Sequence, residues 1–261
     1  MIPGPTTIKK CSECSGLIKE NSILSGNTVG AKYWTDGKGY APMLPDWFWL
    51  VKCPNCHKLL WINELEKITE VEPWEDYKDS KYYNKPELKD YFTKLDSNNL
   101  SNEKILYIRL HAWWLGNNVR RRNDDNWFIQ AWLRIKREEW EKLPDESSKK
   151  LELSKEIESL LSPKEIPILS DEERNNLQML YDMLNSSDYD LLMKAEIRRE
   201  LGQFEDAEDI IKHRYDKKYS KHWFIIKKLV EERDPYLKHF SFIKKLVEKR
   251  DPNVAEIKFE D

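Results

Sequence analysis

Four cysteines are the residues of this sequence with the clearest chemical potential. They form two C-x-x-C pairs, Cys11 with Cys14 and Cys53 with Cys56. A C-x-x-C pair on a tight turn lets two thiolates converge on one ion. Two such pairs complete a tetrahedral four-sulfur shell, which suits zinc because this ion has no geometric preference of its own. The spacing therefore predicts one Zn²⁺ ion bound by these four residues.

The second pair also allows other chemistry, because Cys53 to His57 reads C-x-x-C-H, the pattern of haem attachment. Haem attachment needs only one such pair and normally takes place outside the cytoplasm, whereas the N-terminal residues show no apolar export segment. Thiol redox chemistry and an iron centre remain alternatives to zinc. His57 could replace a cysteine as ligand, but four thiolates already close the shell, so we expect a surface histidine. A closed shell leaves no position for a substrate and predicts a structural ion.

Short strands must position these cysteines. Asp36-Gly37 predicts a hairpin tip between strands at 32–34 and 39–41, and alternating residues from Trp47 to Lys52 predict the strand that delivers Cys53. A further strand is expected at 59–62. The region from about 8 to 65 resembles the zinc-ribbon fold, in which the two cysteine pairs form the two knuckles.

The 38 residues between Cys14 and Cys53 form an insert rich in glycine and aromatic residues. Its aromatic side chains, Trp34 and Tyr40 among them, could stack on a base or a peptide. Alternatively, the glycines serve turns, and the aromatic rings cover a thin core around the ion.

A basic run, Arg120, Arg121 and Arg122, precedes a segment with further tryptophans. These arginines could grip a phosphate backbone while Trp34 and Tyr40 meet bases, which would make the protein a nucleic-acid binder. The other interpretation is a solvated loop whose arginines neutralise nearby carboxylates, with the tryptophans in the core.

The remaining chain is expected to be mainly helical, so the fold class is α+β with a small N-terminal β zinc ribbon. We expect five regions: a ribbon at 1–68, a polar connector at 69–100 with a short helix after Pro86, a helical hairpin at 101–145, a charged linker or helix at 146–170, and a helical region at 171–261. The hairpin helices are predicted at 103–115 and 125–143. Ser170 and Glu173 form a capping box that starts another helix.

The segment around 191–211 resembles a tetratricopeptide (TPR) helical hairpin, with Ala195 and Ala207 as the small packing residues and Gly202 and Phe204 at the turn. The sequence "IKKLVEERDP" at 226–235 returns as "IKKLVEKRDP" at 243–252. Such a period predicts short helices that restart every 17 residues. Stacked helix pairs expose a surface suited to protein partners, and a plain helical bundle is the alternative.

Composition narrows the function. The formal net charge of −3 shows no global polycation, and no apolar run is long enough to cross a bilayer. No nucleotide-binding, hydrolase or metalloprotease motif occurs. We therefore expect a non-enzymatic, cytoplasmic zinc protein without membrane contact, whose helical region binds a protein partner. RNA or DNA binding is the alternative.

Overall fold

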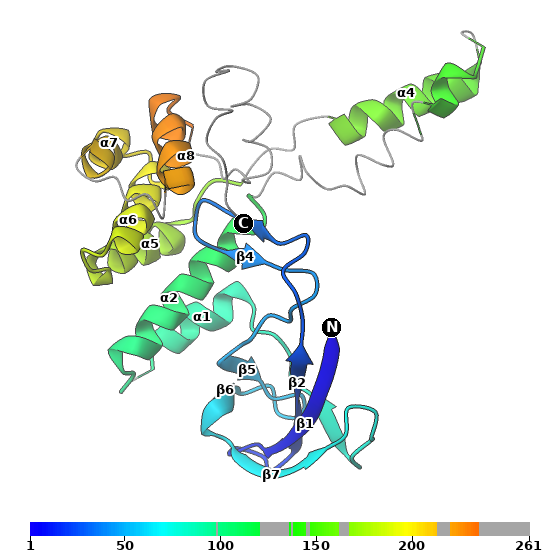
Figure 1. The fold of residues 1–261 in the computed structure, drawn as a ribbon, viewed down its shortest axis with the longest axis vertical. Helices are drawn as coiled ribbons and strands as arrows, with labels where there is room; N and C mark the ends of the chain where they lie inside the picture. The colour runs from blue at the N-terminus through cyan, green and yellow to red at the C-terminus, as the bar shows by residue number, and fades with distance from the viewer. Residues whose placement is uncertain are drawn as a thin grey trace.

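The computed structural model describes residues 1–97, 99–120, 136, 138–144, 147–161, 167–212 and 220–234. Strands occupy the N-terminal part and helices the remainder (Figure 1), so the predicted α+β class is confirmed. Within the described residues, no helix is both long and apolar enough to cross a membrane. Most of the second helix predicted at 125–143 lies outside the described residues. The second copy of the repeat, at 243–252, lies entirely outside them.

A four-stranded sheet in the order β7-β1-β2-β8 forms the N-terminal layer. Its strands are β1 (Ile2–Lys10), β2 (Leu17–Ser25), β7 (Glu66–Val71) and β8 (Ser80–Tyr82). β1 pairs antiparallel with β2 and β7, whereas β8 runs parallel to β2. Thr6 and Ile8 are buried on alternate positions of β1, as expected for a strand with one face on a core.

Part of this sheet differs from the sequence expectation. The segment predicted as a polar connector contributes the end of β7, β8 and helix α1 (Leu88–Leu95). β8 has no alternating apolar residues, and it is placed by backbone pairing with β2. An ion pair between Lys19 and Asp76, at 2.5 Å, also connects β2 to the loop that precedes β8. Such long-range partners leave no periodic signal in the sequence. The short helix expected after Pro86 is confirmed by α1.

Two small hairpins follow the predicted pattern. The insert forms β3 (Lys32–Tyr33) and β4 (Gly39–Tyr40), and the knuckle region forms β5 (Leu50–Lys52) and β6 (Leu59–Trp61). Gly37, at the tip of the first hairpin, has a φ of +77°, which explains the need for glycine there. A short 3-10 helix, η1 (Ile62–Glu64), leads from β6 to β7.

The other described helices are α2 (Asn102–Asn117), α4 (Ser148–Leu161), α5 (Asp171–Met183), α6 (Asp188–Glu200), α7 (Phe204–Lys212) and α8 (Ser220–Glu231). Serine N-caps start three of them, because the side chains of Ser101, Ser170 and Ser187 accept backbone N–H groups of the first turn. The capping box predicted at Ser170 and Glu173 is present.

Helix α2 joins the two halves of the molecule. Its residues Tyr107 and Ile108 pack with Leu50 of β5 and with α1 in one core cluster. One and a half turns later, Trp113 packs with Leu177 of α5 and with α6 in another. Figure 1 shows α2 between the sheet region and the C-terminal helices.

The C-terminal helices enclose a further core. Ala195 of α6 and Ala207 of α7 are fully buried beside Trp223 and Ile226 of α8, so these small residues do allow close helix packing. Gly202 ends α6 with a φ of +77°. Residues 226–231 of the first copy of the repeat lie in α8, where Ile226 and Val230 face this core.

Candidate metal centre

The four cysteines predicted as ligands come together between two hairpins. Cys11 and Cys14 lie in the β1–β2 turn, and Cys53 and Cys56 lie in the β5–β6 turn. Their four sulfur atoms lie within 4.8 Å of one another, and within the described residues they are the one group able to hold a metal ion. Cys11 Sγ is 3.8 Å from Cys56 Sγ, and Cys14 Sγ is 3.7 Å from Cys53 Sγ.

These separations fit a zinc ion rather than disulfides. A disulfide brings two sulfur atoms to about 2 Å, and all four cysteines are free. Four sulfur atoms at the usual Zn–S distance of about 2.3 Å on a tetrahedron lie about 3.8 Å apart. The sulfur–sulfur distances between the two turns, 3.8 and 3.7 Å, agree with that edge length.

The two turns repeat one backbone geometry. The Ser15 N–H donates to the Cys11 carbonyl, and the His57 N–H donates to the Cys53 carbonyl, each at 3.0 Å. In each turn, the first cysteine's N–H donates at 2.9 Å to the carbonyl of the residue five positions later. Ser15 and His57 both have a φ of +60°. The paired loops are therefore two matching knuckles.

Backbone amides prepare the knuckles for thiolates. The Glu13 N–H donates to Cys11 Sγ and the Asn55 N–H to Cys53 Sγ, both at 3.4 Å. Such donors stabilise a charged sulfur atom. They also restrict where each sulfur can point, which favours convergence on one ion.

The pKa values of the two buried thiols are shifted in opposite directions. Burial raises the pKa of Cys11 to about 12, despite opposing amide donors. Burial also acts on Cys53, but the amides of Cys56 and Asn55 outweigh it and lower the pKa to about 7. Since an ion binds thiolates, its uptake must displace protons, and affinity should rise with pH.

The centre is closed on its inner side. Cys11 and Cys53 are buried and pack with Ile18, Val51 and Leu60 in one apolar cluster. His57 is exposed and occupies the turn position with positive φ. The imidazole is therefore at the surface beside the knuckle, as the sequence interpretation expected.

The knuckle hairpin is fastened to α2 by aromatic contacts. The backbone N–H of Trp49 donates to Tyr107 Oη at 2.9 Å, and the two rings stack with centroids 5.0 Å apart. His111 also stacks on Tyr107, with ring centroids 3.8 Å apart, and burial lowers the pKa of His111 to about 4. This histidine is thus neutral at ordinary pH and serves as a packed aromatic residue.

In comparisons with known proteins, no family model, curated protein or solved structure matches the chain.

Of the residues predicted to contact nucleic acid, Arg120 forms contacts within the protein instead. Arg120 Nη2 lies 2.7 Å from a Glu173 carboxylate oxygen, and Arg120 Nε donates to the Pro167 carbonyl at 3.0 Å. Arg120 is thus tied to the start of α5. Arg121 and Arg122 lie outside the described residues.

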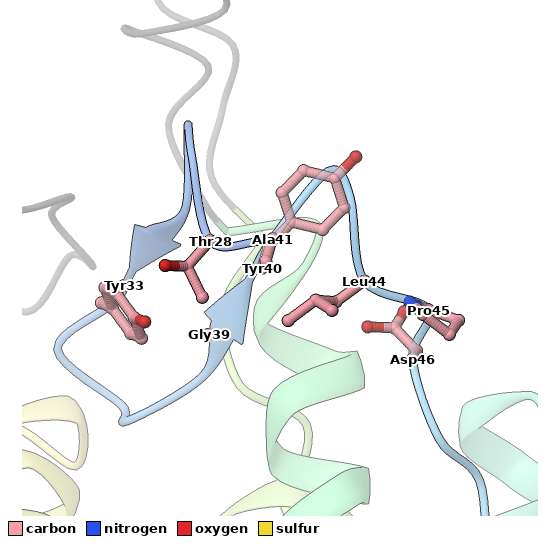
Figure 2. A pocket seen from close by; sticks show the side chains of 8 residues that line it. All are labelled: Thr28, Tyr33, Gly39, Tyr40, Ala41, Leu44, Pro45 and Asp46. Atoms are coloured by element: carbon pink, nitrogen blue, oxygen red, sulfur yellow. The ribbon is translucent and has the colours of Figure 1, made fainter. Parts of the chain in front are cut away.

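Trp34 and Tyr40 lie on the β3–β4 hairpin, where Trp34 is half-buried and Tyr40 is exposed. Tyr33 and Tyr40, one from each strand, line a shallow groove of about 210 Å³ (Figure 2). Figure 2 shows Leu44 and Pro45 of the following loop on its other side. The full lining is Thr28, Tyr33, Gly39, Tyr40, Ala41, Leu44, Pro45 and Asp46.

The sequence interpretation missed a buried polar cluster beneath this hairpin. Asp36, Asn117 and Glu200 meet there from the hairpin, α2 and α6. The Asp36-Gly37 pair predicted only a turn. Glu200 lies in a strongly charged helical segment, which is typical of a solvent-exposed helix face. No local pattern indicates that either carboxyl is buried.

Proposed function

We propose that this protein is a non-enzymatic zinc protein in which one structural Zn²⁺ ion, bound as in a zinc ribbon, fixes a platform for protein–protein interaction. The convergence of the four cysteine sulfur atoms within 4.8 Å of one another is the observation that carries the proposal. A shell of four thiolates offers no open coordination position. The ion would therefore stabilise the fold without activating a substrate.

The ion's position supports this structural role. It would join the β1–β2 knuckle to the β5–β6 knuckle, and the latter packs on α2 through Leu50 and Tyr107. Loss of the ion would therefore loosen the sheet region from the helical region. A reducing compartment such as the cytoplasm would keep the four thiols available.

Two surface features support the proposal that this protein binds a protein partner. The α6–α7 hairpin, with its buried alanines, is of the kind that TPR-like arrays use to present a binding surface. The groove at Tyr33 and Tyr40 offers two exposed aromatic rings, the residue type enriched at interfaces. A partner segment bound there would contact the hairpin directly.

Metal analysis tests the first part of the proposal. We expect one zinc per chain in freshly purified protein and no haem or iron absorbance. Cys53→Ser with Cys56→Ser should lose the metal and the folded sheet region. His57→Asn is the matched control, because asparagine tolerates positive φ and removes only the imidazole. Zinc loss in His57→Asn, or no zinc in the wild type, would contradict the four-thiolate site.

The exposed tyrosines also favour the second candidate, binding of RNA or DNA by base stacking. Titration of single-stranded RNA and DNA at low and moderate salt separates the two candidates. Nucleic-acid binding requires an affinity that falls steeply with salt and weakens in an Arg121→Ala, Arg122→Ala variant. Binding of a protein partner should instead tolerate the arginine changes and depend little on salt.

A further inference from the structure

The four cysteines of the candidate metal centre differ in their exposure to solvent. Cys11 and Cys53 are buried, Cys56 is half-buried and Cys14 is exposed. A small oxidant in solution reacts first with the sulfur atom that it can reach, so accessibility selects the site of oxidation. Cys14 is therefore the cysteine that such an oxidant meets first.

Backbone amides also distinguish Cys14 from the other three cysteines. The first cysteine of each knuckle accepts a backbone N–H at 3.4 Å, and the Lys58 N–H donates to Cys56. Within the described residues, the contact to Cys14 Sγ comes from a second sulfur atom, and no backbone amide donates to it. Amide donors stabilise a thiolate and make it a weaker nucleophile. Cys14 therefore combines the greatest exposure with the least stabilised charge.

A second sulfur atom lies close enough to complete a disulfide. Cys14 Sγ is 3.7 Å from Cys53 Sγ of the other knuckle. A disulfide brings two sulfur atoms to about 2 Å, so they must approach by less than about 2 Å. The two knuckles already touch there, since a Cβ added at Gly16 would lie 2.2 Å from Asn55 Nδ2. An accessible cysteine beside a partner thiol is the usual arrangement of a redox-sensing site.

We infer that Cys14 is a site of oxidation by hydrogen peroxide, and that it forms a reversible disulfide with Cys53 that releases the zinc ion. This inference rests on the zinc site of the proposed function. A bound ion keeps the four thiols deprotonated, and the thiolate is the form that attacks an oxidant.

The reaction has two steps. The Cys14 thiolate attacks one peroxide oxygen, so an S–O bond forms and the O–O bond breaks. The hydroxide that leaves takes up a proton and becomes water. The Cys53 thiolate then attacks the sulfur of the Cys14 sulfenic acid, so the S–S bond forms, the S–O bond breaks and a second hydroxide leaves as water after protonation. Two thiolates are oxidised and one peroxide is reduced.

The disulfide would change the site in a defined way. It removes two of the four ligands, and the two remaining thiols, Cys11 and Cys56, cannot complete a tetrahedral shell. The new bond spans the β1–β2 and β5–β6 turns, so it keeps the two knuckles joined after the ion has left. Reduction of the disulfide restores the four thiols. Disulfides in a reducing compartment are typically transient in this way.

Peptide mapping of the wild type tests the inference directly. The zinc-loaded full chain is treated with one equivalent of hydrogen peroxide, and zinc release is followed with a chromogenic chelator. Trypsin leaves each cysteine pair on one peptide, 11–19 or 53–58, because each peptide follows a lysine and ends with one. We expect these peptides to be joined by a Cys14–Cys53 bond, the zinc to be lost, and both changes to be reversed by dithiothreitol and added zinc. A disulfide within one knuckle, a Cys11–Cys56 bond without the expected one, or zinc loss without any disulfide would overturn the inference.

Two matched variants test the role of Cys14. Cys14→His keeps four ligands, since zinc accepts a histidine nitrogen, and zinc release at the same peroxide dose should be lost. Cys56→His makes the same exchange in the other knuckle and should release zinc as the wild type does, because Cys14 and Cys53 remain. Equal release from the two variants would overturn the assignment to Cys14. If Cys14→His takes up no zinc, the wild-type mapping decides by itself.

Zinc content before treatment separates the two levels of the proposal. An untreated chain without zinc would contradict the proposed function and this inference together. A zinc-loaded chain that forms no Cys14–Cys53 bond would overturn this inference alone.

Discussion

The buried Arg199 gives a stringent test of how the C-terminal helices hold together. It is among the largest fully buried side chains of the described residues. Its guanidinium donates to both carboxylate oxygens of Glu196 on the same helix, and to the Asp234 carbonyl beyond α8. Although burial lowers the pKa of Arg199, the attraction of Glu196 outweighs it and the pKa is raised. The arginine is therefore charged and connects α6 to the end of α8.

Arg199→Met removes this charge and keeps most of the aliphatic volume. The Glu196 carboxylate is then buried without a cation, beside Glu200, and the Asp234 carbonyl loses a donor. Breaking a buried pair in this way costs about 3–5 kcal/mol. We expect the free energy of unfolding to fall by about 4 kcal/mol. Adding Glu196→Gln removes the unpaired charge, so the double variant should recover about 2 kcal/mol of this loss.

Urea unfolding of the protein, followed by helical circular dichroism and tryptophan fluorescence, measures both effects. The matched control is Arg174→Met, which changes an exposed arginine of α5 and should alter stability by less than about 0.5 kcal/mol. A loss below about 1 kcal/mol in Arg199→Met would refute the buried-pair argument. A double variant no more stable than the single variant would refute the assignment of the cost to Glu196.

Two further predictions concern the contacts between the halves of the molecule. Tyr107→Phe leaves the Trp49 N–H without its acceptor, and the free energy of unfolding should fall by about 1–2 kcal/mol in the same urea assay; an unchanged value would rule out that hydrogen bond. Gly37→Ala and Gly202→Ala both place alanine at a φ of +77°. The new Cβ at position 37 would lie 2.7 Å from Tyr189 Oη, whereas the new Cβ at position 202 would have no atom within 4 Å. Gly202→Ala should cost about 1 kcal/mol and Gly37→Ala at least about 1 kcal/mol more; equal losses would contradict docking of the hairpin tip.

Local chemistry explains which features could be predicted from the sequence. Two C-x-x-C pairs contain all four residues of the candidate metal centre, so the sulfur cluster could be predicted from their spacing. The turn at Gly37 and the capping box at Ser170 depend on residues within three positions of each other. The zinc-ribbon and TPR-like resemblances, and any partner, stay predictions.

Features that depend on distant partners could not be predicted. β8 has no alternating pattern and is positioned by β2. Arg120, interpreted as a candidate phosphate contact, is paired with Glu173, 53 residues further along the chain. A charged side chain looks the same in a sequence whether water or a distant carboxylate surrounds it.

The amino-acid sequence by itself therefore determined the candidate metal ligands, the hairpin tip and the start of α5, because short-range geometry governs each of them. Only the tertiary structure decided where the hairpin docks and which charged groups are buried. Asp36 and Glu200 are 164 positions apart, and they meet because α2 brings Asn117 between them. Burial of a charged group is a property of the assembled core, to which every packed element contributes.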